Sequence, residues 1–146
     1  MRRFGEAIVH GQVYRPRPGA YAIIHDGRDL LLTLQLDPLP EYQLPGGGID
    51  RAENPQQALH REVFEETGWK VAVQRRIGVF QRFCHMPEYD LWAQKICQVY
   101  VCRAVLQVSE PPEPHHRAIW TRPETALDML AGDGDRYMLR LWLAGH

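Results

Sequence analysis

The sequence predicts an α/β domain in which a mixed β-sheet lies between helices. Two observations point to this fold class. Segments rich in β-branched and aromatic residues recur along most of the chain, and helix signals occur in its middle and near its C-terminal end. The length of 146 residues and the hydrophobic content of 45% suit one domain with an ordinary core. We therefore expect residues 1–146 to form a single domain.

The first part of the chain is expected to supply four strands. Ala7–Tyr14 and Ala20–His25 have the composition of strands. Asp26-Gly27-Arg28 has glycine at the centre of a turn, and Leu30–Leu36 is the strand that returns from it. Glu41–Leu44 is expected to be a short strand that ends before a run of glycines.

Residues Pro55–Thr67 are predicted to form a helix. Asn54 is a good N-cap, and the missing N–H group of Pro55 costs nothing at the first helical position. Gln57, three residues after Asn54, can complete a capping box. Gly68 is the natural C-terminal stop of this helix.

The second half of the chain is expected to contain three strands followed by two helices. β-Branched and aromatic residues predict the strands, and a proline near a helix start and one apolar helix side predict the helices. Gly132-Asp133-Gly134 is expected to separate the two helices. In chain order, these elements are Val71–Phe83, Lys95–Val105, Ile119–Thr121, Pro123–Leu130 and Arg136–Ala144.

Three carboxylates crowd one face of the central helix. Glu62, Glu65 and Glu66 lie within two turns, and residues three or four apart on a helix are neighbours. Like charges at this spacing repel one another, and negative charge near the helix C-terminus opposes the helix dipole. A divalent cation is the simplest compensating partner, because Mg²⁺ and Mn²⁺ prefer carboxylate, carbonyl and water ligands.

A run of three glycines, Gly46-Gly47-Gly48, lies between the short strand and this helix. Glycine allows a backbone to approach a ligand closely, so a turn here can fold back and offer backbone groups to the same cation. The spacing does not fit a dinucleotide-binding fingerprint, and no Gly-Lys-Ser/Thr follows that would mark a phosphate-binding P-loop.

Residues 47–69 match a complete Nudix box, which is the signature of Nudix hydrolases. The chain therefore resembles this family. The resemblance implies a Nudix-type α/β/α sandwich with a mixed β-sheet over the whole chain. It also implies hydrolysis of a nucleoside diphosphate linked to another group, with Mg²⁺ or Mn²⁺ as cofactor. The matched pattern is Gly47-x5-Glu53-x7-Arg61-Glu62-Val63-x-Glu65-Glu66-x-Gly68-Trp69.

The resemblance also implies roles for the box residues. Glu62 and Glu66 are expected to be direct metal ligands. Glu65 is expected to bind a metal directly or through water, or to act in proton transfer. A backbone carbonyl of Gly46 or Gly47 is expected to be a further ligand.

Two box residues are expected to be structural. The resemblance implies an ion pair between Glu53 and Arg61 that ties the loop to the helix.

A cation held by the carboxylates could neutralise pyrophosphate charge, orient the substrate and lower the pKa of a water that attacks phosphorus.

The general base stays open between several residues. Many Nudix enzymes supply a glutamate from the loop before the last strand, and Glu113 is the nearest match here, with Glu110 second. His115 or His116 could act instead, because histidine titrates near physiological pH.

Substrate recognition is expected in the segment His85–Asp90, which lies between the two long strands. Tyr89 and Trp92 are candidates for stacking on a nucleobase. Trp69 and Trp142 are expected in the core instead. A nucleoside triphosphate or a small nucleoside diphosphate derivative is the expected substrate.

Composition narrows the remaining classes. The formal net charge of −1 gives no reason to expect nonspecific nucleic-acid binding, and no long apolar stretch predicts a membrane span. The three cysteines, Cys84, Cys97 and Cys102, lack the spacing of a disulfide framework or structural zinc site. The N-terminus lacks the apolar core of a signal peptide, so we expect a cytoplasmic protein. The oligomeric state is open, with a homodimer as one candidate.

The leading functional hypothesis is metal-dependent hydrolysis of a phosphoanhydride bond in a nucleotide-like substrate. Two alternatives stay open, a non-catalytic nucleotide sensor on the same fold and an isoprenoid-diphosphate isomerase. The complete acidic set argues against the sensor, and nothing singles out a catalytic cysteine for the isomerase.

Overall fold

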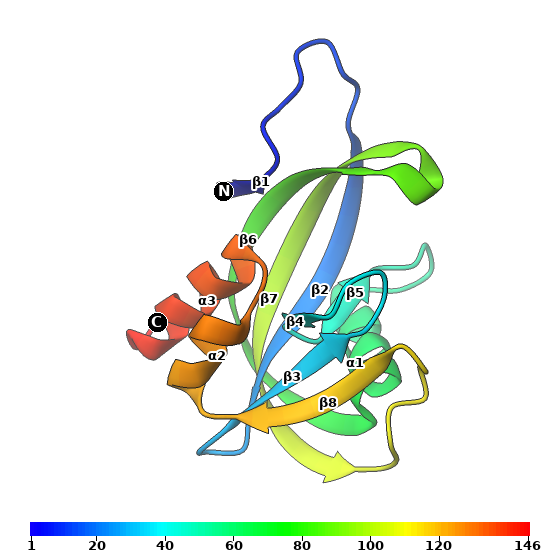
Figure 1. Ribbon diagram of the computed structural model, residues 1–146. Coiled ribbons are helices and arrows are strands. Elements are labelled where there is room, and N and C mark those ends of the chain that lie inside the picture. Colours follow the sequence, from blue (N-terminus) through cyan, green and yellow to red (C-terminus); the bar gives the residue numbers. More distant parts are fainter.

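The computed structural model describes residues 1–146 and shows a strongly curled mixed sheet with helices on both of its faces (Figure 1). The strands follow the order β1-β6-β7-β2-β3-β4, while β5 pairs with β2 and β8 pairs with β3. The strands are β1 Arg2–Gly5, β2 Arg15–His25, β3 Leu30–Gln35, β4 Glu41–Gln43, β5 Gly46–Gly48, β6 Trp69–Met86, β7 Leu91–Gln107 and β8 His116–Thr121. The helices are α1 Pro55–Thr67, α2 Pro123–Met129 and α3 Asp133–Leu143, and a short 3₁₀ turn covers Pro87–Tyr89.

The sheet separates two apolar cores, because side chains alternate between its faces along each strand. On β2, Ile23 belongs to the core beneath α2 and α3, which also includes Phe80. Its neighbour Ile24 belongs to the core beneath α1, which also includes Leu59. Figure 1 shows α2 and α3 on one side of the sheet and α1 on the other. The predicted α/β/α sandwich with a mixed sheet is therefore confirmed.

Most predicted elements are present, several with longer bounds. Helix α1 has the predicted bounds, and β3 agrees within one residue. Strands β6 and β7 are longer than predicted because they form one antiparallel ribbon with continuous pairing from Trp69 to Met86 apart from bulges. Partner strands extend the ladder beyond the residues whose composition favours a strand.

The predicted strand at Ala7–Tyr14 is wrong. These residues form an irregular connection between β1 and β2, and Val13 within it is 76% exposed. The apolar residues of this segment have no neighbouring strand, because β6 and β7 already pair with β1 and β2. Figure 1 shows the segment as a loop that projects from the end of the sheet. Composition alone cannot form a strand without a partner.

The glycine run is also different from the prediction. Gly46–Gly48 forms strand β5, which pairs antiparallel with β2, instead of the predicted turn that folds back towards the helix. Gly132 is the N-cap of α3, so the helix begins earlier than the predicted Arg136. Helix α3 accepts Gly134 because a Cβ atom there would lie 2.2 Å from the Phe80 ring. Both glycine segments allow close contact between elements, although only the first was expected to do so.

Helix α1 is closed at both ends by local hydrogen bonds. The Asn54 side chain accepts from the N–H of Gln57, and the Gln57 side chain accepts from the N–H of Asn54, each over 2.9 Å. Gly68 adopts a left-handed conformation and its N–H donates to the carbonyl of Phe64. The predicted capping box and C-terminal stop are confirmed. None of the helices combines the length and hydropathy that crossing a membrane requires.

Replacing Asn54 by alanine is expected to lower the free energy of unfolding by about 1 kcal/mol, because the N–H of Gln57 loses its acceptor. Urea denaturation followed by circular dichroism measures this change. Asn54→Asp, which retains an acceptor, is the matched control and should lose much less stability. Equal stability of Asn54→Ala and wild type would show that the capping box contributes nothing.

Candidate active site

Helix α1 places two glutamates against the glycine strand. Glu62 and Glu66 are one helical turn apart, so both project from the same face of α1. Glu66 is only 6% exposed, and its Oε1 accepts a hydrogen bond from the backbone N–H of Gly46 over 3.1 Å. This contact joins the C-terminal half of α1 directly to β5.

Gly47 has no room for a side chain because the Glu62 carboxylate occupies that space. A Cβ atom at position 47 would lie 2.6 Å from Cδ of Glu62. Gly46 has a φ of +145°, and a Cβ atom there would lie 2.3 Å from the carbonyl oxygen of Ala20. Gly48 opens onto free space. The backbone of β5 therefore passes beside both carboxylates, and two of its three residues need to be glycine.

The loop before β8 brings two more polar groups to Glu66. The N–H of Glu113 donates to the carbonyl of Glu65 over 3.0 Å, which holds this loop at the end of α1. Nδ1 of His116 lies 2.9 Å from the Thr33 hydroxyl, and its Nε2 lies 4.0 Å from Oε2 of Glu113. Ligand atoms of Glu66, Glu113 and His116 lie within 4.8 Å of one another.

The Arg61 guanidinium connects the loop after β5 to α1. Its Nε donates to Glu53 over 2.7 Å, and one terminal nitrogen donates to Glu62 over 3.0 Å. The other terminal nitrogen donates to the carbonyl of Gly48 over 3.0 Å. Arg61 therefore forms an ion pair with Glu53 and also fixes the position of Glu62.

Glu65 lies at the edge of this arrangement. Its carboxylate is 3.4 Å from Arg61, and 38% of its side chain is exposed. It is not a member of the group formed by Glu66, Glu113 and His116. Its backbone carbonyl, which holds Glu113, is the closest connection between Glu65 and that group.

Burial controls the ionisation of the site. It raises the pKa of Glu66 well above its usual range, although the hydrogen bond from Gly46 acts in the opposite direction. Burial also raises the pKa of Glu62, while the hydrogen bond from Arg61 lowers it. The hydrogen bond from Arg61 lowers the pKa of Glu53 to about 2. Glu62 therefore has a cationic partner in Arg61, whereas Glu66 has none.

These residues fit a divalent cation. Glu66 is a buried carboxylate without a cationic partner, and Glu113 and His116 bring an oxygen and a nitrogen donor within reach of the same point. Burial lowers the pKa of His116, which favours the neutral imidazole that metals bind. Carboxylates suit Mg²⁺, and a carboxylate set with one imidazole also suits Mn²⁺.

Of the other residues that were predicted to take part in function, some line the site and others lie outside it. Tyr89 lines the cleft beside Glu62 and Glu66. Trp92 lies in β7 instead of the expected loop, does not line the cleft, and has its ring centroid 4.5 Å from that of His85. His115 points away from the site, because its Nδ1 lies 2.9 Å from Asp37.

The cleft has a volume of about 290 Å³ and includes residues that were not predicted from the sequence. Arg17, Gln43 and Lys95 line it together with the carboxylates and His116. These residues come from β2, β4 and β7 and become neighbours only through the pairing of the strands. No local pattern in the sequence marks them.

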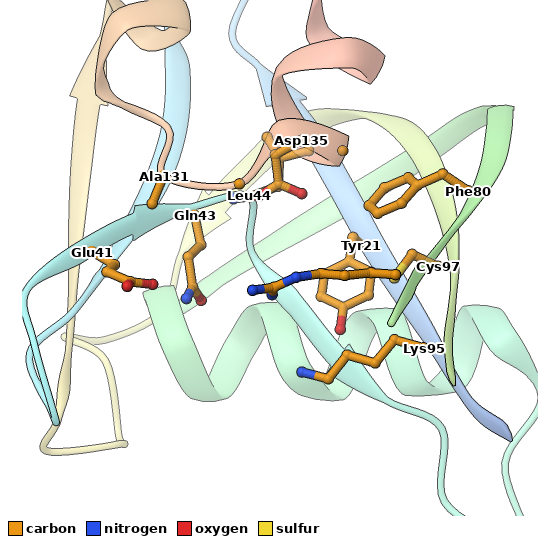
Figure 2. Close-up of a pocket in the computed structure, with 12 residues that line it drawn as sticks. Tyr21, Glu41, Gln43, Leu44, Phe80, Lys95, Cys97, Ala131 and Asp135 are labelled. Atoms are coloured by element: carbon orange, nitrogen blue, oxygen red, sulfur yellow. Dashed lines mark hydrogen bonds between the residues drawn. The ribbon is translucent and has the colours of Figure 1, made fainter. Parts of the chain in front are cut away.

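A second cavity of about 160 Å³ adjoins the cleft and shares Tyr21, Gln43 and Lys95 with it. Figure 2 shows these three side chains extending into one space, with Asp135 on its far side. Oδ2 of Asp135 accepts a hydrogen bond from the N–H of Leu44 over 3.1 Å. Burial raises the pKa of Asp135 to about 6. We call this space the adjoining cavity.

Comparisons with known proteins agree on one family. The family model for the NUDIX domain matches residues 15–142. A Bacillus subtilis protein, provisionally named an 8-oxo-dGTP diphosphatase, is 38% identical over 64 residues, which cover 44% of this chain and 43% of that protein. An RNA pyrophosphohydrolase from Cereibacter sphaeroides is 43% identical over 56 residues, covering 38% of this chain and 34% of its own length. The chain thus matches less than half the length of either relative.

A solved structure extends the likeness to the whole fold. A NUDIX hydrolase from Nitrosomonas europaea superimposes with a TM-score of 0.74 over 90% of both chains, at 18% sequence identity. At this level of identity, the likeness concerns the fold alone. It agrees with the arrangement of sheet and helices seen here.

Replacing Gly47 by alanine is expected to displace the Glu62 carboxylate and weaken Mn²⁺ binding by about tenfold or more. Isothermal titration calorimetry with Mn²⁺ measures this effect. Gly48→Ala is the matched control, since a Cβ atom at position 48 meets nothing within 4 Å. Mn²⁺ affinity that is equal in the two variants would contradict the role of Gly47.

Asp135 is expected to make stability depend on pH. Its folded-state pKa of about 6 lies above the ordinary 3.8, so the folded state holds the proton more tightly. Stability linked to this proton is fully present below the ordinary pKa and is lost as the pH rises through 6. Between pH 5 and 7.5, metal-free wild type should therefore lose roughly 1 kcal/mol more stability than Asp135→Asn. Urea denaturation in EDTA at both pH values measures the difference, and parallel losses would contradict this account.

Proposed function

The chain belongs to the Nudix hydrolase family, and from this premise we propose that it hydrolyses a phosphoanhydride bond. The proposed substrate is a nucleoside di- or triphosphate derivative, and the proposed cofactor is Mg²⁺ or Mn²⁺. The names of the two relatives support the bond type, because one is a diphosphatase and the other a pyrophosphohydrolase.

One structural observation carries the proposal. The buried Glu66 carboxylate is held by Gly46 and lies with Glu113 and His116 around one point, without a cationic side chain among them. A protein rarely keeps a buried carboxylate uncompensated unless a ligand supplies the missing charge. A divalent cation supplies that charge and is also what pyrophosphate chemistry requires.

Glu62, Glu66 and Glu113 or His116 would hold the cation, and a carbonyl of Gly46 or Gly47 is a further candidate ligand. When bound, the cation neutralises the pyrophosphate charge and makes a nearby water easier to deprotonate. The protein itself contributes by holding the metal-binding carboxylates in position. Arg61 holds Glu62 in place, while the Gly46 N–H fixes one oxygen of Glu66.

We assign proton removal to the loop before β8. Glu113 is 44% exposed in its side chain, and its Oε2 lies 4.0 Å from Nε2 of His116. The exposure of its carboxylate leaves Glu113 accessible to water. Burial lowers the pKa of His116, and its Nδ1 contacts Thr33, so it serves best to orient Glu113 or a ligand. Glu65, beside Arg61, is the weaker candidate for proton transfer.

Substrate recognition is proposed for Tyr89, which lines the cleft and is 68% exposed. An exposed aromatic ring at the edge of a cleft is suited to stack on a base. The Trp92 ring packs against His85 and does not line the cleft, so Trp92 is the weaker candidate. Tyr89 is therefore the first residue to replace in tests of base recognition.

Replacing Glu66 by glutamine is expected to lower kcat by at least about 100-fold, because the cation loses a charged ligand. The fold should persist, since the glutamine oxygen can still accept from Gly46 and the buried charge is removed. A screen of nucleoside triphosphates, nucleotide sugars, ADP-ribose and capped RNA, with Mg²⁺ and Mn²⁺, supplies the assay through released phosphate or pyrophosphate. Circular dichroism and thermal melting verify the fold.

Glu124→Gln, an exposed glutamate of α2, is the matched control and should keep wild-type turnover. Unchanged turnover of Glu66→Gln would sink the proposal. Tight nucleotide binding without hydrolysis in the wild type would favour a sensor. Turnover of isopentenyl diphosphate would favour an isomerase, although burial raises the pKa of Cys97 and Cys102 to about 12 and keeps both thiols protonated.

A further inference from the structure

A row of three cationic side chains crosses the sheet beside the cleft. Arg17 of β2 is the register partner of Lys95 in the parallel strand β7. Lys95 is in turn the register partner of Arg82 in the antiparallel strand β6. Register partners project from the same face, and neighbouring strands lie about 4.8 Å apart. Arg17, Lys95 and Arg82 are called the cation row.

The cation row is electrostatically unfavourable in the protein alone. Like charges directly opposite each other on neighbouring strands destabilise a sheet. No carboxylate lies close enough to any of the three side chains to form an ion pair. Asp135 lines the same cavity as Arg82 and Lys95, and both cations act on its carboxylate from a distance. The fold nevertheless places three positive charges side by side without a direct ion pair, which is the arrangement expected of an anion site.

The row leads from the candidate active site to the adjoining cavity. Arg17 and Lys95 line the cleft that contains Glu62 and Glu66. Lys95 and Arg82 line the adjoining cavity. An extended anion that is bound at the carboxylate end of the cleft can therefore also contact all three cations of the row. Figure 2 shows the Lys95 side chain extending into the same space as Tyr21 and Gln43.

The charges on the two sides of the cleft differ. Glu62 and Glu66 are carboxylates, and a divalent cation bound to them would leave little net positive charge for a substrate. The cation row supplies that charge. A terminal phosphate carries a second ionised oxygen near neutral pH, whereas a pyrophosphate esterified at both ends has no terminal phosphate. Three adjacent cations thus suit a chain with a terminal phosphate better than a nucleotide sugar.

We propose that Arg17, Lys95 and Arg82 bind the phosphate chain of the substrate, and that this substrate is a nucleoside triphosphate. The inference rests on the proposed function and adds the substrate class to it. The row lies next to the cleft, so phosphates bound there remain in reach of the carboxylate cluster.

The adjoining cavity limits where the phosphates lie. Its far side carries Glu41 and Asp135, whose carboxylates repel phosphate. Phe80 supplies an aromatic wall to the same cavity. The phosphates of the substrate therefore stay on the cation row and do not extend to this far side.

Binding of phosphate to the row can be measured without catalysis. Isothermal titration calorimetry in Mg²⁺ buffer would compare methylene-bridged, non-hydrolysable analogues of pyrophosphate and tripolyphosphate. Wild type should bind the tripolyphosphate analogue more tightly, and Lys95→Gln and Arg82→Gln should each weaken it by about tenfold. The loss should shrink as salt concentration rises, because salt screens exposed charges.

Arg103→Gln is the matched control. Arg103 is also an exposed cation of β7, but it lines neither the cleft nor the adjoining cavity. Its replacement should leave tripolyphosphate binding unchanged. Equal binding of both analogues by wild type, or equal losses in Lys95→Gln and Arg103→Gln, would overturn the proposal.

Turnover decides the substrate class. Wild type, Lys95→Gln and Arg82→Gln would be compared on nucleoside triphosphates, a nucleotide sugar and a 5′-triphosphorylated RNA. The row variants should lose about tenfold in kcat/KM with nucleoside triphosphates and clearly less with the nucleotide sugar. Preference of wild type for the nucleotide sugar or the RNA would overturn the substrate class. Absence of any turnover would refute the proposed function, while calorimetry would still decide whether the row binds phosphate.

Discussion

The contact between Glu66 and the backbone of Gly46 is the constraint on which the rest of the site depends. It brings a buried carboxylate of α1 against a strand that must be glycine at two positions. Glu62 fills the space that a side chain at position 47 would need. The two carboxylates are therefore positioned by the close approach of α1 to β5.

This constraint creates a deficit of positive charge that the protein does not correct. Arg61 is committed to Glu53 and reaches Glu62, but no cationic side chain joins the group around Glu66. Across the cleft, the cation row carries positive charges that have no carboxylate in direct ion-pair contact. A divalent cation on the carboxylates and a phosphate chain on the row would balance both, so the charges of the protein complement those of its proposed ligands.

The sequence was sufficient for the parts whose signals are local. The caps of α1 are set by Asn54 and Gly68, and the spacing of Glu62 and Glu66 follows from the helix itself. Contacts that depend on strand pairing could not be predicted in this way. Arg17, Lys95 and Arg82 are far apart in the chain, and His116 reaches Glu66 only through the pairing of β8 with β3. The strand predicted at Ala7–Tyr14 is absent for the same reason, because a strand needs a partner strand to pair with.

The position of the cation tests the central claim most directly. Crystals of the protein soaked with Mn²⁺ allow the ion to be located by its anomalous scattering. The account predicts a peak at coordination distance from a carboxylate oxygen of Glu66, with Glu62, Glu113 or His116 among the other ligands. A peak only elsewhere on the surface, or none at saturating Mn²⁺, would contradict it.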